Sequence, residues 1–149
     1  MKNQLLKNKV IVVTGGSGGI GSAIVNKLAS YDAKVCAVYH RNITANYYDK
    51  NICWFQVDIT KTEEIDKLFT STLQKYGRID VLINCAGCLE PGEFSSLDAN
   101  QISKMIDVNL TSTLTLTHKV LSVMKNQRSG HIINIGSLGG IVPMPYSSV

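Results

Sequence analysis

The sequence predicts a doubly wound α/β fold, in which helices cover both faces of a parallel sheet. Two observations carry this prediction. Short apolar runs rich in β-branched residues alternate along the chain with segments of helical periodicity. The apolar runs also lack a regular alternation with polar residues, which is typical of parallel strands buried on both faces. We therefore expect a three-layer α/β/α domain that contains five parallel strands.

The predicted strands and helices follow one another in regular order. The five strands are expected at residues 9–14, 34–39, 53–58, 80–85 and 131–135. Three helical segments are expected between them, at residues 20–29, 60–77 and 97–125. Ligands bind at the carboxyl ends of the strands in such a fold, so the residues that follow each strand matter most.

Local signals indicate how the first two helices begin, end and face the core. The apolar positions of the first helix share one face and are Ile20, Ala23, Ile24 and Leu28. The second helix begins at a capping box, in which the Thr60 side chain accepts from the Glu63 amide and the Glu63 side chain reaches back. Gly77 ends this second helix.

Length and composition exclude several classes of protein. The 149 residues have the size of one domain, and the 44% hydrophobic and 17% charged fractions exclude a disordered chain. No apolar run approaches the ~18 residues that cross a membrane, and no secretory signal follows the basic N-terminus. The net charge of +4 comes from scattered residues rather than a basic tract. We therefore expect a cytoplasmic protein that binds neither nucleic acid nor a membrane.

The four cysteines indicate reduced thiols rather than a disulfide framework, because the chain carries no export signal. Cys85 and Cys88 form a C-x-x-C pattern, which leaves open a redox pair or half of a zinc site. Cys36 and Cys53 are far apart in the sequence, and the three histidines lack ligand spacing. We therefore expect no metal site.

The glycine-rich loop after the first strand carries the strongest functional signal. Thr14-Gly-Gly-Ser-Gly-Gly-Ile-Gly21 stands between a strand and a helix and contains the pattern G-x-G-x-x-G. Glycine lets the backbone approach a pyrophosphate closely, and a helix N-terminus favours an anion. No Lys-Ser/Thr pair follows the glycines, which excludes a P-loop. The loop predicts a dinucleotide phosphate site, with a flexible turn as the alternative.

The same octapeptide fits the pattern Thr-Gly-x-x-x-Gly-x-Gly, and four later motifs accompany it in order. They are Asp58-Ile59 after the third strand, Asn84-Cys-Ala-Gly87 after the fourth, Asp107-Val-Asn-Leu110 in the third helical segment and Ile132-Ile-Asn-Ile-Gly-Ser137 at the fifth strand. With these motifs the chain resembles the short-chain dehydrogenase/reductase family along its whole length. The resemblance implies a Rossmann-like fold, a nicotinamide dinucleotide cofactor, and hydride transfer to or from a small alcohol or carbonyl substrate.

The resemblance also implies roles for individual residues. Ser137 would orient and polarise the substrate carbonyl, and Asn109 would hold a water in the proton relay. The implied cofactor-binding residues outside the second strand are Thr14, Gly15, Ser17, Gly19, Ile20, Gly21, Asp58, Ile59, Asn84, Ala86 and Gly87. Cys85 departs from the family's Asn-Asn-Ala-Gly pattern. Purely structural roles stay open for Asp58 as a helix cap and for Asn84 and Ser137 as turn residues.

The end of the second strand predicts which nicotinamide cofactor is used. NAD-selective folds place an acidic residue about 20 positions beyond the glycines, where it binds the ribose 2′-hydroxyl. Counted from the glycines, that region of this chain holds Tyr39, His40 and Arg41 instead. Arg41 can pair with a 2′-phosphate. We therefore predict that NADP is preferred over NAD.

The resemblance further implies a catalytic Tyr with a Lys four residues later. Tyr146 is the only tyrosine after Ser137, its spacing is shorter than the family's, and no Lys can follow it at that distance. We therefore interpret Tyr146 as a substrate-side or structural residue and expect the catalytic Tyr at position 150.

On this interpretation, residues 1–149 are a single NAD(P)-binding Rossmann domain that is incomplete at its C-terminus and inactive by itself. The parent enzyme would be a homodimer or homotetramer. The alternative is a non-catalytic dinucleotide-binding protein that ends at Val149.

Overall fold

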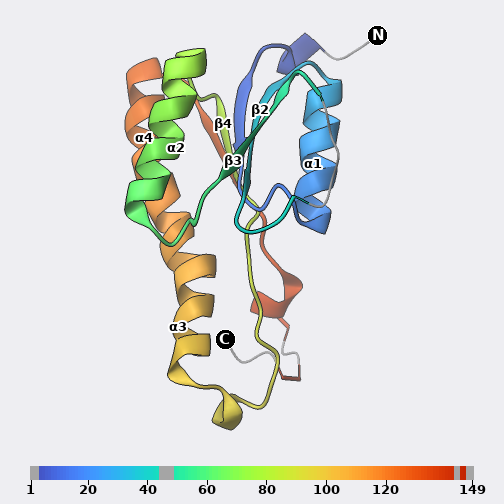
Figure 1. The fold of residues 1–149 in the computed structure, drawn as a ribbon, viewed down its shortest axis with the longest axis vertical. Coiled ribbons are helices and arrows are strands. Elements are labelled where there is room, and N and C mark those ends of the chain that lie inside the picture. The colour runs from blue at the N-terminus through green and yellow to red at the C-terminus, as the bar shows by residue number, and fades with distance from the viewer. Residues whose placement is uncertain (1–3, 44–48, 143–144, 147–149) are drawn as a thin grey trace.

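The computed structural model describes residues 4–43, 49–142 and 145–146 and arranges them in three layers, with helices on both faces of a sheet (Figure 1). The strands are β1 (Val10–Val13), β2 (Lys34–Tyr39), β3 (Ile52–Gln56), β4 (Val81–Asn84) and β5 (His131–Asn134). They form one sheet in the order β3-β2-β1-β4-β5, and every neighbouring pair is parallel. Strands β2 and β3 therefore lie on one side of β1, and strands β4 and β5 lie on the other. This order confirms the predicted doubly wound fold.

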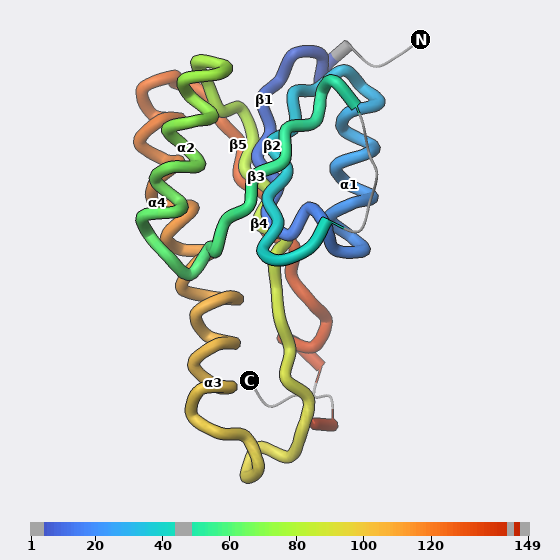
Figure 2. The backbone as a smooth tube through the Cα atoms, in the orientation of Figure 1, coloured from blue at the N-terminus to red at the C-terminus, as the bar shows by residue number. Residues whose placement is uncertain are grey.

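The helices divide unequally between the two faces. They are α1 (Gly19–Ser30), α2 (Thr62–Tyr76), α3 (Ala99–Ile106) and α4 (Ser112–Gln127). α1 covers one face, and α2 and α4 lie side by side on the other. α3 continues the direction of α4 beyond the carboxyl ends of the strands (Figure 2). Among the described residues, none of the helices has both the length and the apolar character that a membrane crossing requires.

The core consists of two clusters, one on each face of the sheet. In β1, Val12 packs toward α2 and α4, whereas Ile11 and Val13 pack toward α1. All three side chains are at most 1% exposed. Strands that are buried on both sides need apolar residues at every position, which explains the continuous apolar runs of the sequence.

The buried Asp80 carboxylate joins the beginnings of β1 and β4. It accepts hydrogen bonds from the backbone N–H of Val10 at 2.9 Å and from Arg78 Nη2 at 2.6 Å. Burial alone would raise the pKa of Asp80, but these hydrogen bonds and the charges of Arg78 and Lys9 outweigh it, and the pKa lies below its ordinary value. This link fixes the relative position of two strands whose far ends carry the functional loops.

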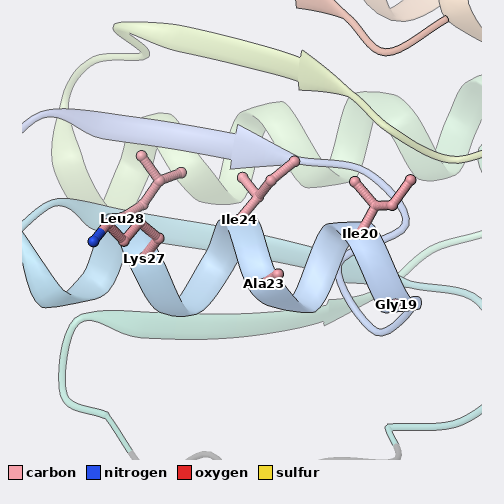
Figure 3. Close-up of a pocket in the computed structure, with 6 residues that line it drawn as sticks. All are labelled: Gly19, Ile20, Ala23, Ile24, Lys27 and Leu28. Atoms are coloured by element: carbon pink, nitrogen blue, oxygen red, sulfur yellow. The ribbon is translucent and has the colours of Figure 1, made fainter.

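The apolar face predicted for α1 is only partly turned to the core: Ile24 and Leu28 pack against the core cluster, whereas Ala23 is exposed. The buried positions are Gly21, Val25 and Ala29, whereas Ile20 is 64% exposed. Two of the three buried residues are small, so the helix can lie close to the sheet, and apolar periodicity gives little weight to small residues. The predicted stripe instead forms a flank of the helix, on which Ile20, Ile24 and Leu28 line an open apolar groove (Figure 3).

The predicted capping box of α2 was also wrong. The N-cap residue is Lys61, and no side chain caps the helix there. The Thr60 hydroxyl donates to Asp58 Oδ1 at 2.7 Å, because a carboxylate two residues earlier is a strong local acceptor. The predicted C-terminal residue is confirmed, since Gly77 ends the helix with a φ of +73°.

The third helical segment is interrupted where the sequence predicted continuity. A capping box formed by Asp98 and Gln101 begins α3, and a π-helical turn at Asp107–Thr111 separates α3 from α4. The hydroxyl of Thr113 donates to the backbone carbonyl of Asn109, four residues back, at 3.1 Å. A hydroxyl that bonds to the carbonyl four residues back and an extra residue in one turn do not change the spacing of apolar residues. The apolar pattern therefore did not reveal the interruption.

Candidate functional site

The loop between β1 and α1 is a turn that only glycine can occupy at two positions. Gly15 has a φ of +66°, and a Cβ there would lie 2.8 Å from the Ala86 Cα. A Cβ on Gly21 would lie 2.1 Å from the carbonyl oxygen of Gly15. A side chain at Gly21 would therefore separate the first turn of α1 from the glycine turn, and a side chain at Gly15 would push away the loop after β4.

The N-terminus of α1 is open toward solvent. Gly18 is its N-cap residue and offers no side-chain hydrogen bond to the first turn. A Cβ on Gly19 would contact nothing within 4 Å, and Gly18, Gly19 and Ile20 are all exposed, while Ser17 is half-buried. A twelve-residue helix whose first amides have no side-chain cap presents N–H donors and a positive dipole end to an anion.

Thr14 joins this turn to the loop after β4. Its side chain is buried, and its Oγ1 accepts hydrogen bonds from the backbone N–H groups of Cys85 at 3.0 Å and Ala86 at 3.1 Å. The hydroxyl also donates to the Ile83 carbonyl at 3.5 Å. The structure thus engages the Thr14 hydroxyl within the protein, where it holds two loops of the site together.

A polar network joins the carboxyl ends of β4 and β5. Asn84 is 4% exposed, and its Nδ2 donates to Asn134 Oδ1 at 2.8 Å and to Thr117 Oγ1 at 3.4 Å. Its Oδ1 has no hydrogen-bond partner among the described residues. Sequence reasoning missed Asn134 and Thr117, although a polar residue at the end of the apolar fifth strand was a visible signal for Asn134.

Asn109 lies in the π-helical turn and holds the backbone of the loop after β4. Its Nδ2 donates to the Cys88 carbonyl at 2.8 Å, and its Oδ1 accepts from the Cys88 N–H at 2.9 Å. Both polar atoms of the side chain are therefore bonded to one backbone unit. The sequence singled out Asn109 but contained no signal for this partner.

Ser137 follows β5 in an exposed loop. Its Oγ accepts from the Gly139 N–H at 3.1 Å. A hydroxyl has one donor hydrogen and two lone pairs, so this bond leaves the hydrogen available for another group. Ser137 lines one pocket with Asn84 at the end of β4, Ala86 and Gly87 in the loop that follows, and Asn109 in the π-helical turn.

The remaining predicted cofactor residues lie at the carboxyl ends of β2 and β3. His40 Nε2 is 3.8 Å from Asp58 Oδ2, and Arg41 is exposed. The Tyr39 ring packs edge-on against Trp54 at 6.2 Å between centroids. Ile59 is only 9% exposed and belongs to the core, so its backbone rather than its side chain faces this edge.

The charge of Asp58 is stabilised by its neighbours. Burial alone would raise the pKa of this carboxyl, but hydrogen bonds from the Thr60 hydroxyl and N–H and the charges of His40 and Lys61 lower it below its ordinary value. Asp58 is therefore ionised at neutral pH and can accept hydrogen bonds at the edge of the site.

The C-x-x-C residues point to different partners. Cys85 packs against the core cluster on the α1 face, and the Sγ of Cys88 is 3.8 Å from the Lys104 carbonyl. In the part of the chain that the structure describes, no group of three or more His, Cys, Asp or Glu side chains is arranged to hold a metal. Tyr146 is exposed, and its carbonyl accepts from the Gly92 N–H at 3.1 Å.

Comparison with known proteins identifies one family along nearly the whole chain. The family described as short chain dehydrogenase matches residues 9–149. An uncharacterized oxidoreductase of Staphylococcus saprophyticus is 36% identical over an alignment 149 residues long, which covers 97% of this chain and 61% of that protein. A Staphylococcus aureus counterpart is 34% identical over an alignment 150 residues long, which covers 97% of this chain and 65% of that protein. The chain thus spans about three-fifths of the length of these curated relatives.

Solved structures agree with this similarity. A short chain dehydrogenase from Leptospira borgpetersenii with bound NAD+ has a TM-score of 0.89 and 31% identity, covering 93% of this chain and 55% of that one. A structure named ElxO with NADP bound has a TM-score of 0.85 and 29% identity, covering 94% of this chain and 60% of that one.

The glycine turn gives a direct test of the geometry. We expect Gly21→Ala to lower the free energy of unfolding by about 3 kcal/mol or more, because its Cβ would collide with the Gly15 carbonyl. The matched control Gly19→Ala has open space and should change it by less than about 1 kcal/mol. Urea unfolding followed by circular dichroism measures both. Equal stability of the two variants would contradict the close approach.

Proposed function

The chain belongs to the short-chain dehydrogenase family, and on that premise we propose that it provides the dinucleotide site and part of the catalytic site of an NAD(P)(H)-dependent oxidoreductase. The reaction would transfer a hydride between nicotinamide and an alcohol or ketone. One observation carries the proposal: the uncapped N-terminus of α1 lies at the end of β1, and the pocket with Ser137 and Asn109 lies at the ends of the next strands, β4 and β5. Phosphate binding and carbonyl chemistry would then occur along one edge of the sheet.

The residues present fit a dinucleotide. The first amides of α1 would bind the pyrophosphate, and the missing side chain of Gly19 leaves room for its approach. Asp58 is held ionised and would accept a hydrogen bond from the adenine amino group. The cofactor, when bound, supplies or accepts the hydride.

Ser137 is the residue of this chain that we assign to the substrate oxygen. Its Oγ keeps its hydrogen free while accepting from Gly139, so it can donate to a carbonyl and stabilise negative charge that develops there. Asn109 has both side-chain atoms bonded to Cys88, so we assign it a positioning role: it holds the loop that forms one wall of the pocket.

Arg41 supports a preference for NADP. It is exposed directly after His40, and no acidic residue occupies residues 39–41, where one would repel a 2′-phosphate. The negative charge of Asp58 at this edge is already balanced in part by Lys61. A phosphate near Arg41 would therefore meet a cation that is open to solvent.

The proposed reaction is tested by Ser137→Ala in the natural protein at its full length. We expect kcat for ketone reduction to fall by about 100-fold or more, because one donor to the developing oxyanion is lost. The dissociation constant for NADPH should stay within about twofold, since Ser137 is assigned to the substrate rather than to the cofactor. The measurement is NADPH absorbance with a panel of carbonyl substrates.

Ser129→Ala is the matched control, because Ser129 is exposed at the opposite end of β5. It should reduce the panel at the wild-type rate. Full activity of Ser137→Ala would contradict the assignment. A wild-type protein that binds the cofactor but reduces no carbonyl would favour a non-catalytic dinucleotide-binding protein.

The cofactor preference is tested by Arg41→Gln. We expect this change to weaken NADPH binding about tenfold and to leave NADH binding unchanged, because a charge-assisted hydrogen bond to phosphate is worth about 1.5–3 kcal/mol. Arg128→Gln is the control, since Arg128 ends α4 away from the carboxyl edge. Calorimetric titration gives the dissociation constants, and tighter binding of NADH than NADPH by the wild type would overturn the preference.

A further inference from the structure

A second cluster of reactive side chains lies outside the dinucleotide site, where the end of α2 packs over β2 and β3. Cys36 of β2 and Cys53 of β3 are direct partners in the register of the parallel pair. The sulfur of Cys36 accepts from the Thr72 hydroxyl at 3.7 Å, and the Nζ of Lys75 is 3.3 Å from the sulfur of Cys53. Both cysteine side chains therefore point to the α2 face of the sheet.

The spacing of the two backbones is compatible with a bond between the sulfurs. Neighbouring parallel strands lie about 4.8 Å apart, and disulfides join Cα atoms about 4.4–6.8 Å apart. Register partners in a parallel pair point to the same side of the sheet, so the two side chains lie on one face with their backbones within the range of a disulfide.

The two thiols have unequal surroundings. Cys36 is 0% exposed, and its burial raises the pKa to about 11, even though the Thr72 hydrogen bond lowers it in part. Cys53 is half-buried on the edge strand, with the Lys75 ammonium beside it. The Lys75 Nζ donates to the Cys53 sulfur, so a cation lies beside the atom that would attack an oxidant. Cys53 is therefore the thiol of this pair that an oxidant meets first.

Cys85 and Cys88 lack the combination found at Cys53, which is a partly exposed sulfur with a lysine ammonium beside it. Burial raises the pKa of both Cys85 and Cys88. The ammonium nearest Cys88, that of Lys104, forms an ion pair with Glu90. Among the described residues no carboxylate forms an ion pair with Lys75, which instead lies 5.3 Å from the centroid of the Tyr76 ring.

We propose that Cys53 and Cys36 form a peroxide-sensitive dithiol, in which Cys53 reacts with hydrogen peroxide and Cys36 then closes a reversible disulfide. In the first step the Cys53 thiolate attacks a peroxide oxygen, an S–O bond forms, the O–O bond breaks, and hydroxide leaves and is protonated to water. In the second step the Cys36 sulfur attacks the Cys53 sulfur, an S–S bond forms, and the S–O bond breaks. The leaving hydroxyl takes the Cys36 proton as water, so two thiols and one peroxide give one disulfide and two waters.

The disulfide would join the strands that lead into the adenosine end of the proposed cofactor site. Cys36 precedes His40 in β2, and Cys53 precedes Asp58 after β3. The proposal does not depend on the proposed oxidoreductase activity, because it rests on sulfur chemistry and on contacts at the α2 face.

Peptide mapping tests the proposal on the natural protein at its full length. After treatment with hydrogen peroxide at pH 7 and blocking of free thiols, trypsin releases Cys36 in residues 35–41 and Cys53 in residues 51–61, while Cys85 and Cys88 share residues 79–104. Mass spectrometry without reductant should show a 35–41/51–61 pair, which dithiothreitol separates. Cys36→Ser should instead leave a sulfenic acid on Cys53 that dimedone traps.

Lys75→Met tests the role of the cation without altering either cysteine. We expect it to slow formation of the peptide pair about fivefold or more, because the ammonium 3.3 Å from the Cys53 sulfur, beside the reacting atoms, is lost. Lys67→Met, at an exposed position of the same helix, is the matched control and should react at the wild-type rate. The proposal is overturned if oxidation begins at Cys85 or Cys88, if Cys53 is oxidised without linking to Cys36, or if Lys75→Met reacts as fast as wild type.

Discussion

The close approach of α1 to the end of β1 is the constraint on which the rest of the site depends. No Cβ fits at Gly21, because the Gly15 carbonyl oxygen occupies that space, and none fits at Gly15 beside the backbone of Ala86. The contact at Gly21 places the N-terminus of α1 at the carboxyl edge of the sheet. The contact at Gly15 places the loop after β4 against the same turn. A larger residue at either position would move the helix dipole away from the place where an anion can meet it.

The loops around this turn are held by side chains that bond to backbone groups. Thr14 ties the glycine turn to Cys85 and Ala86, and Asn109 ties the π-helical turn to Cys88. A hydrogen bond from the buried Asn84 amide to Asn134 joins the ends of β4 and β5. These links fix irregular backbone at the carboxyl edge of the sheet, and they leave the Ser137 hydroxyl hydrogen free in the resulting pocket.

The sequence predicted the sheet and its strands, because apolar runs and glycine turns are strong local signals. The sequence did not predict the cap of α2 or the buried residues of α1, because local and tertiary interactions compete at these positions. Thr60 bonds to Asp58 rather than capping α2, and small residues, not the apolar stripe with Ile20, bury the inner face of α1. The partner of Asn109 is a backbone group 21 residues away, and no local pattern encodes such a pairing. The roles of Ser137 and Arg41 stay predictions, since they concern ligands rather than the folded chain.

The central claim is that the glycine turn and the neighbouring strand ends form one dinucleotide site, and amide chemical shifts test it most directly. NADP+ titrated into the ¹⁵N-labelled protein should shift the amides of residues 15–21, 40–41, 58–59 and 84–87 together, with one dissociation constant. Cys53 and Lys75, on the α2 face, should shift little. Saturable binding that leaves residues 15–21 unmoved, or shifts confined to another surface, would contradict the account.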